Sequence, residues 1–319
     1  SISGAPKGVK QFVCADGLEV GISRISTETI LYCSGGDRIK LAGGWTNFII
    51  CPDWLLKGGD DMRIVVLVKR VPDTASVFKI GADGKSVDLS GLKYVMSPYD
   101  EYAVEEAVKI KETGGADVVL LGVGPPETKD IIRAGLAMGA DSGVLILSPA
   151  ETALTPRGTA HALAAALRDL AADLVLAGKQ AVDDDASQVP ERVAELLGWP
   201  HVSTITQLAL SGNIATVHRE IEGGYYVYET PLPAVFSTQK GINVPRYPTL
   251  PNIMKAKKKE IREISLDSLG LSGAMLEPGM SIVSAALPRQ ARLGRILEGE
   301  LDQQVRQLVA ILREQEKVL

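Results

Sequence analysis

Two short segments, each following a predicted strand, contain residue types that could hold an anionic ligand. Lys69 and Arg70 follow an apolar run and place two cations at a strand end, where they could face an anion. Gly122-Val123-Gly124-Pro125-Pro126 follows a second apolar run, and its glycines would let a ligand approach the backbone ahead of a helix N-terminus. Each segment alone has a structural alternative, a solvated strand end or a tight turn.

A third segment, residues 178–189, also follows a predicted strand and opens a predicted helix. Gln180, Ser187 and Gln188 offer neutral hydrogen-bond groups for a base or a ribose. The three consecutive aspartates at 183–185 could suggest a metal, but adjacent side chains diverge and no histidine or further carboxylate cluster accompanies them, so we expect no metal site. The last of these aspartates or Ser187 could cap the helix, and backbone N–H groups would have to bind any phosphate.

No catalytic constellation accompanies these segments. His161, His201 and His218 have no serine or cysteine nucleophile signature nearby, and we interpret all three as structural. The chain could be an electron carrier, and we assign it no acid, base or nucleophile of its own. A net charge of −5 makes nucleic acid an unlikely partner, and no apolar stretch is long enough to insert into a membrane.

The body of the chain alternates between apolar runs and amphipathic segments. Strands are predicted at 62–69, 117–122, 143–147 and 173–178, and helices at 98–112, 126–138, 159–169 and 188–197. This order predicts an α/β fold with a doubly wound, mainly parallel, Rossmann-like sheet and helices on both faces. The charged residues of the first helix, Glu105 and Glu106 among them, are expected mostly outside.

Three further patterns depart from this alternation. Residues 76–90 are predicted to form a hairpin around Asp83-Gly84. Residues 201–238 change to a period of two with glycine turns near 212 and 223, which predicts antiparallel strands added to the sheet. Residues 239–300 show little periodicity and are expected to form an extended arm, which the terminal helix, apolar at Leu301, Val305, Leu308 and Leu312, completes.

The first 61 residues differ from the rest. They contain all three cysteines and no sustained period, and Met62 opens an apolar strand at once. We therefore predict that 1–61 is a non-native extension, upstream sequence translated in frame, with a genuine extension as the alternative. The predicted organisation is 1–61 extension, 62–238 nucleotide-binding α/β domain, and 239–319 recognition loop and C-terminal arm.

Five stretches carry a family resemblance: VLVKRVPD (66–73), SPYDEYAVEEAVKIKE (97–112), LAMGAD (136–141), DLVLAGKQAVDDDASQ (173–188) and PRYPTLPNIMKAKKKEI (245–261). Residues 62 to about 271 resemble the β subunit of the electron transfer flavoproteins. The resemblance implies a heterodimer with an α subunit that holds most of one FAD. It also implies transport of electrons from acyl-CoA dehydrogenases or related flavoenzymes, as in fatty acid oxidation, towards a membrane quinone oxidoreductase.

The resemblance also implies site residues. The nucleotide pocket would use Leu67, Ser97, Pro98, Tyr99, Asp100, Val123, Gly178, Lys179, Gln180, Ala181, Val182, Asp183, Asp184, Asp185, Ala186, Ser187, Gln188 and Val189. The loop that grips the dehydrogenase would use Leu250, Pro251, Asn252, Ile253, Met254, Lys255 and Lys258. Leu250 would be its apolar anchor, and we expect a cytoplasmic, bacterial protein.

The nucleotide in this subunit is AMP in most members of that family and a second FAD in its electron-bifurcating members. Ser97, Ser187 and Val189 depart from the AMP type, and Gly124-Pro125-Pro126 is similar to the bifurcating type. Asp184, however, would crowd and repel the diphosphate of an FAD, which favours AMP. The alternatives are a bifurcating subunit with a second FAD, or an adenine-nucleotide-binding module without redox chemistry.

Overall fold

A computed structural model describes residues 10–13, 19–25, 28–33, 62–148, 154–271, 273–276, 281–287 and 294–318. Near the N-terminus it contains an antiparallel sheet of β1 (Lys10–Val13), β2 (Glu19–Ile25) and β3 (Glu28–Cys33). The sequence pattern did not predict these strands. The other residues of 1–61, to which we assigned a non-native origin, lie outside the described residues.

The body is built on one sheet of nine strands in the order β12-β11-β10-β13-β9-β4-β7-β8-β14. Its strands are β4 (Met62–Val68), β7 (Ala116–Gly124), β8 (Ser142–Leu147), β9 (Leu174–Gly178), β10 (His201–Ser211), β11 (Ile214–Ile221), β12 (Gly224–Pro231), β13 (Ala234–Thr238) and β14 (Ile261–Ser265). All neighbouring pairs from β10 to β14 are parallel, and β11 and β12 extend the sheet in antiparallel pairing. The predicted α/β class and mainly parallel sheet are confirmed.

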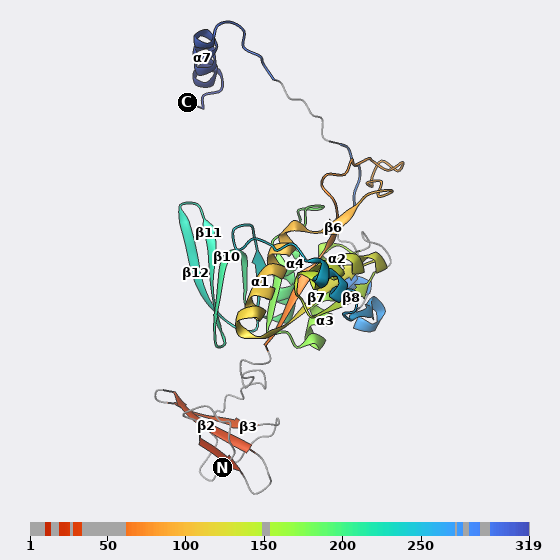
Figure 1. Cartoon of the computed structure of the whole chain (residues 1–319), viewed down its shortest axis with the longest axis vertical. Helices are drawn as coiled ribbons and strands as arrows, with labels where there is room; N and C mark the ends of the chain where they lie inside the picture. Colours follow the sequence, from red (N-terminus) through yellow and green to blue (C-terminus); the bar gives the residue numbers. More distant parts are fainter. Residues whose placement is uncertain are drawn as a thin grey trace. The chain divides into compact units, whose positions relative to one another are not determined.

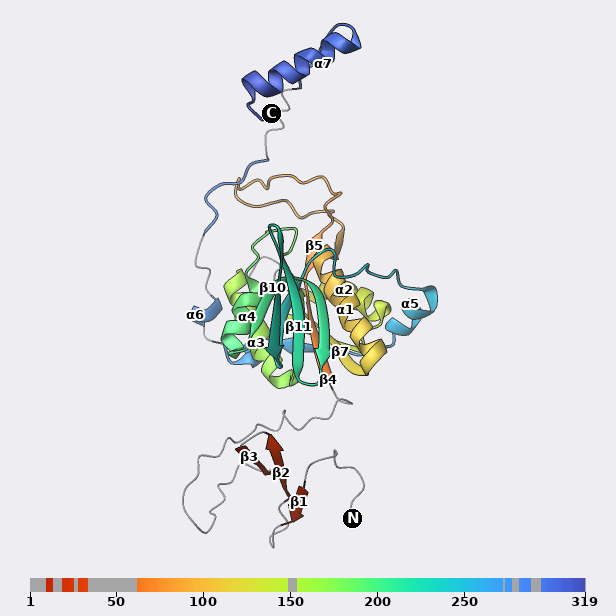
Figure 2. The ribbon, with the colours of Figure 1, turned by 90° about the vertical axis from the view of Figure 1, so that its left-hand side faces the viewer.

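Helices cover both faces of this sheet (Figures 1 and 2). One layer contains α1 (Pro98–Gly114), α2 (Lys129–Met138) and α5 (Leu250–Ala256), and the other contains α3 (Pro156–Leu170) and α4 (Val189–Leu197). Successive side chains of a strand point to opposite faces. In β4, Ile64 and Val66 therefore pack into the core under α1 and α2, while Val65 and Leu67 pack into the core under α3 and α4.

Three predictions of placement are corrected by the structure. β13 lies within the antiparallel region predicted at 201–238, yet it pairs in parallel with β9 and β10. β14 falls in the supposed arm and forms the edge strand beside β8. Glu105 and Glu106 are buried, with 5% and 6% exposure, because residues far along the chain supply them with hydrogen-bond donors.

The small strands β5 (Arg70–Pro72) and β6 (Tyr94–Met96) pair in antiparallel fashion next to the main sheet. Two short 3₁₀ segments, Pro126–Thr128 and Leu266–Leu269, and the four-residue α6 (Gly273–Leu276) complete this unit. The second structural unit consists of residues 77–90 and the C-terminal residues from 281.

In that second unit the predicted hairpin is confirmed. Ile80 bridges Val87, and Gly84 adopts a φ of 64° in the turn. The terminal helix is α7 (Leu301–Ala310), which continues as π-helix over Ile311–Gln315. Leu301, Val305 and Leu308 are exposed, whereas Leu312 is half-buried. None of the described helices is long and apolar enough to cross a membrane.

Candidate functional site

The strand order places a topological switch point between β9 and β4. The chain runs from β4 to β7 and β8 on one side, and then returns to β9 and β13 on the other side of β4. Open α/β sheets bind ligands in the crevice at the carboxyl ends of such strands. The three segments singled out in the sequence follow β4, β7 and β9, which are neighbours in the sheet, so the fold brings them to one edge.

The side chain of Asp100 lies at this switch point and bridges the ends of β4 and β9. It extends from the first turn of α1, and its two oxygens accept the backbone N–H groups of Lys69 at 2.7 Å and Gly178 at 3.1 Å. Burial raises the pKa of the Asp100 carboxyl to about 7, although these two hydrogen bonds and the charge of Lys69 lower it. Asp100 therefore fixes the ends of β4 and β9 relative to each other.

Gly178 is the end of β9 and lies directly against the start of α1. A Cβ at this position would lie 2.4 Å from Asp100 Oδ1 and 2.7 Å from the carbonyl carbon of Tyr99. Thr238, at the end of β13, donates its hydroxyl to the carbonyl of Ala177 at 3.2 Å and accepts the backbone N–H of Lys179 through its carbonyl at 3.0 Å. Only a residue without a side chain fits at 178.

Lys69 does not stand free to face a ligand, contrary to the expectation from sequence. Its ammonium donates to Asp183 at 2.8 Å and to Asp184 at 3.0 Å. Burial alone would lower the pKa of Lys69, but hydrogen bonds and charge from the two aspartates raise it above its ordinary value. Arg70 also faces a protein group, because its guanidinium lies 3.5 Å from the centroid of the Tyr94 ring. The site thus contains two carboxylates held by one ammonium.

Loop 178–189 folds on itself through its side chains. Gln180 donates to Asp185 at 2.8 Å and accepts from Ser187 at 3.3 Å. Both Asp185 and Ser187 adopt positive φ angles, 47° and 49°. The prediction that one of them caps α4 was wrong: Gln188 occupies the N-cap position and no side chain accepts a hydrogen bond there. In the first turn of α4, Pro190 has no N–H group, and Arg192 donates its N–H to the carbonyl of Gln188 at 3.1 Å.

The remaining predicted pocket residues lie around this loop. Ser97 is fully buried, and its hydroxyl is 3.5 Å from the carbonyl of Gln180. The ammonium of Lys179 lies 4.9 Å from the ring centroid of Tyr99. Leu67 and Val123 lie on β4 and β7, and Leu67 is itself buried in the core. Ser97, Tyr99, Asp100 and loop 178–189 form one connected cluster, whereas Leu67 contributes mainly to packing.

Thr128 is a feature of this edge that the sequence did not reveal. It is fully buried, and its hydroxyl has no hydrogen-bond partner among the described atoms. The hydroxyl lies where a Cβ on Gly124 would approach to 2.4 Å. An unpaired buried hydroxyl has a free-energy cost.

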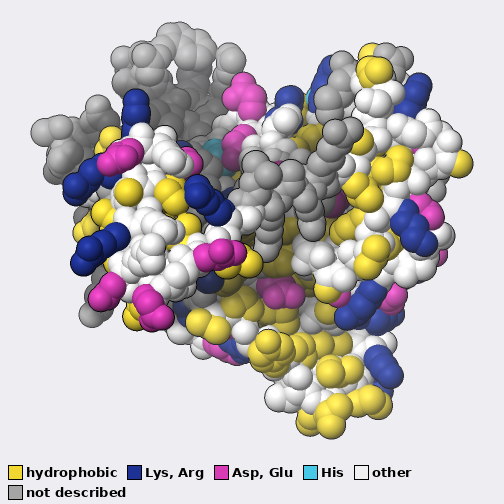
Figure 3. Space-filling view, turned by 90° about the horizontal axis from the view of Figure 1, so that it is seen from above, with side chains coloured by type: hydrophobic (Ala, Val, Ile, Leu, Met, Phe, Trp, Pro, Cys, Tyr) yellow, Lys and Arg dark blue, Asp and Glu magenta, His cyan; other side chains and the backbone are white. Residues whose placement is uncertain are grey.

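The predicted dehydrogenase-binding residues form a second, separate surface. Leu250 to Lys255 lie in α5, which Thr249 caps by accepting the N–H of Asn252 at 3.4 Å, and Lys258 follows the helix. Leu250 is 79% exposed and Met254 59%, whereas Ala256 is buried. α5 packs on α2. Figure 3 shows the molecule from above, where acidic, basic and apolar side chains are intermixed.

Comparisons with known proteins decide the family. The family model described as the electron transfer flavoprotein domain matches residues 86–269. The electron transfer flavoprotein subunit beta of Bacillus subtilis is 38% identical over 259 residues, covering 81% of this chain and all of the relative. The human subunit beta is 40% identical over 257 residues, covering 80% and 98%. The chain belongs to the electron transfer flavoprotein β-subunit family.

The family assignment agrees with the fold and with the resemblance found in the sequence. The matched residues of this β-subunit chain include α1, loop 178–189 and α5. The histidines of the chain lie outside the cluster at the switch point: His161 is in α3, His201 opens β10, and His218 stacks on Tyr225 at 4.9 Å. Among the described residues, no group of three or more His, Cys, Asp or Glu could hold a metal ion.

Proposed function

We propose that this chain pairs with an α subunit and carries electrons from acyl-CoA dehydrogenases or related flavoenzymes towards a quinone oxidoreductase. The bound FAD supplies the electron chemistry and would be held mostly by the α subunit. The described part of this chain contributes a rigid sheet, a nucleotide site and an exposed apolar helix, α5. The proposed binding of a partner rests on Leu250. Its apolar side chain is 79% exposed on a short ordered helix, which suits a docking anchor.

The electron-transfer proposal is tested with the purified complex of both subunits. We expect an acyl-CoA dehydrogenase, reduced by its acyl-CoA substrate, to reduce the flavin of the complex in a saturable reaction. A complex that contains flavin but accepts electrons from neither acyl-CoA dehydrogenases nor related flavoenzymes would contradict the proposal and favour a nucleotide-binding module without redox chemistry.

We further propose that the switch point holds AMP. The start of α4, where the N-cap residue makes no side-chain hydrogen bond, offers the backbone N–H of Val189 to one phosphate, and loop 178–189 offers side chains to the ribose and base. Asp183 and Asp184 share the single ammonium of Lys69, so the loop retains excess negative charge beside the phosphate position. A second phosphate next to these carboxylates would be repelled, which disfavours the diphosphate of a second FAD.

Competition between AMP and ADP for the nucleotide-depleted complex tests this charge argument. We expect the wild-type complex to prefer AMP, and Asp184→Asn to reduce that preference. Asp117→Asn is the control, because it removes the same charge near the start of β7, away from the loop, where Asp117 pairs with Arg63. An unchanged preference in Asp184→Asn would contradict the role of this carboxylate.

A further inference from the structure

The segment from Asn243 to Lys259, here called the docking arm, carries the apolar side chains with which this family member would meet a partner. Val244, Tyr247, Leu250 and Met254 are between 59% and 95% exposed. Exposed side chains on a free loop would adopt many arrangements, and binding would have to order them. The contacts of the arm with α1 and α2 prevent this freedom.

The first anchor of the docking arm is the pair of Arg246 and Glu105. The carboxylate of the buried Glu105 accepts from Arg246 Nε at 2.8 Å, from Nη2 at 2.9 Å and from the backbone N–H of Arg246 at 3.1 Å. Glu112 accepts two more hydrogen bonds from the same guanidinium, at 2.5 and 2.9 Å. The pKa of Arg246 is raised by Glu112 and Glu105, so the guanidinium stays charged.

Glu105 thus holds the main chain of the arm as well as its side chain. Three residues earlier in the arm, Asn243 donates to Glu106 at 2.9 Å and to the carbonyl of Tyr102 at 3.0 Å. The two acceptor carboxylates, Glu105 and Glu106, are consecutive residues of α1. Only three residues separate Arg246 from Leu250, so this anchor sets where α5 begins with the exposed leucine.

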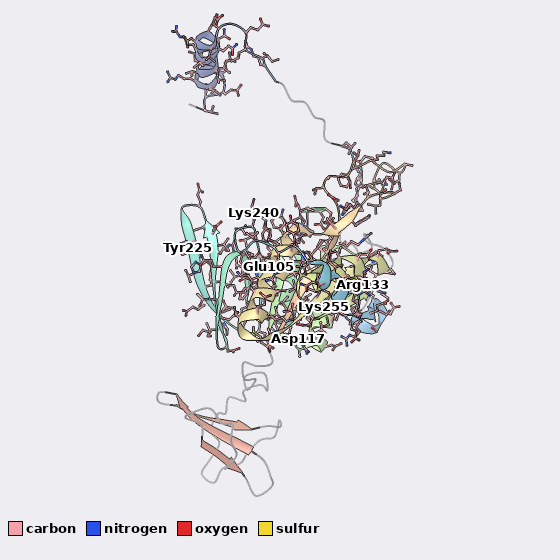
Figure 4. The ribbon with its side chains drawn as sticks, viewed as in Figure 1. Glu105, Asp117, Arg133, Tyr225, Lys240 and Lys255 are labelled. Atoms are coloured by element: carbon pink, nitrogen blue, oxygen red, sulfur yellow. The ribbon has the colours of Figure 1, made fainter. Side chains whose placement is uncertain are left out.

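The second anchor holds the other end of the arm on α2. Arg133 donates to the carbonyls of Ala256 at 3.1 Å and Lys257 at 3.3 Å, at the C-terminus of α5. The ammonium of Lys259 donates to the carbonyls of Leu136 and Ala140 near the end of α2. Glu105 and Arg133, labelled in Figure 4, belong to α1 and α2 and thus fix opposite ends of the arm.

Stability alone is a poor explanation for this pair, in which Glu105 is buried and Arg246 is half-buried. An apolar pair of similar volume commonly stabilises a fold as well as a buried ion pair does. A bidentate pair with an added bond to the backbone fixes geometry in a way that apolar contacts do not. We propose that Arg246 and Glu105 are positioning residues that keep α5 ordered before it meets a partner's apolar surface, an inference that rests on the proposed partner role.

The test uses Arg246→Lys in the complete complex, because lysine keeps the positive charge but loses the bidentate geometry. We expect the acyl-CoA dehydrogenase concentration at half-saturation to rise about ten-fold, since the arm must then be ordered on binding. The limiting rate and the flavin content should not change, and amide hydrogen exchange across 247–256 should become faster. Glu112→Gln is the matched control, since Glu112 is the exposed partner of the same guanidinium, and it should change half-saturation less than about two-fold.

The outcomes separate this inference from the proposed function. An unchanged half-saturating dehydrogenase concentration would overturn the positioning role, whether or not the limiting rate falls. If the wild-type complex accepts no electrons, the proposed function fails. The positioning role is then still tested by amide hydrogen exchange, and an unchanged exchange rate across 247–256 in Arg246→Lys would overturn it. If that variant does not assemble, Glu105→Gln, which keeps the shape and one acceptor oxygen, repeats both measurements with the same expected directions.

Discussion

Replacing Asp100 by asparagine should change how the stability of the protein depends on pH. Asp100 is buried at the switch point and accepts one backbone N–H on each oxygen, from Lys69 and Gly178. Burial raises its pKa to about 7. Asparagine keeps the shape but turns an amide NH₂ towards one of the two N–H groups, and an unmade buried hydrogen bond costs about 1–3 kcal/mol.

The sign and size follow from linkage. A carboxyl with a raised pKa in the folded state contributes stability that is fully present below its unfolded pKa of about 3.9 and is lost as pH rises through about 7. Between these values the contribution falls by about 1.4 kcal/mol per pH unit. From pH 5 to pH 8 the wild-type protein should therefore lose ~3 kcal/mol through this group, and Asp100→Asn should not.

The measurement is the thermal midpoint of the two-subunit complex, wild type and Asp100→Asn, at intervals between pH 5 and pH 8. The advantage of the wild type over the variant should shrink by several degrees as pH rises. Asp117→Asn is the control, because this aspartate is exposed and paired with Arg63, and its curve should run parallel to the wild type. An advantage that stays constant or grows with pH would show that Asp100 is already ionised at pH 5.

Two further substitutions test the two surfaces separately. Leu250→Ala should raise the half-saturating dehydrogenase concentration about ten-fold, since a leucine buried at an interface contributes about 1.5–3 kcal/mol. Val77→Ala is the control, because Val77 is 81% exposed elsewhere on the chain, and it should leave that concentration unchanged. Loss of flavin in Leu250→Ala would contradict a docking role. Gly178→Ala should lower the thermal midpoint and the AMP content, because its Cβ would meet Asp100 Oδ1 at 2.4 Å. Gly114→Ala, where a Cβ meets nothing within 4 Å, is the control, and normal AMP content in Gly178→Ala would show that the close approach does not matter.

Local patterns explain what the sequence could predict. The apolar runs of β4, β7, β8 and β9 and the amphipathic helices between them follow from hydrophobic periodicity. Because parallel strands present their carboxyl ends at one edge, a parallel sheet with β4, β7 and β9 as neighbours brings the three ligand segments together. The order of elements required no long-range information.

Pairings between distant residues explain what the sequence could not predict. β13 has an apolar, β-branched composition that suits either pairing direction, and its place between β9 and β10 depends on strands elsewhere in the chain. Glu105 was expected outside because its partner, Arg246, lies 141 residues away. Lys69 was expected free because Asp183 lies 114 residues away. Thr128 carried no signal, since an unpaired buried hydroxyl is visible only in three dimensions.

The central claim is that the switch point of this subunit holds one adenylate while a single flavin serves electron transfer. The direct measurement is to purify the two-subunit complex, release its small molecules by denaturation, and count flavin and AMP per complex by chromatography. The account predicts one FAD and one AMP. Two FAD without AMP would contradict the charge argument at Asp184, and a complex with neither nucleotide would contradict the site itself.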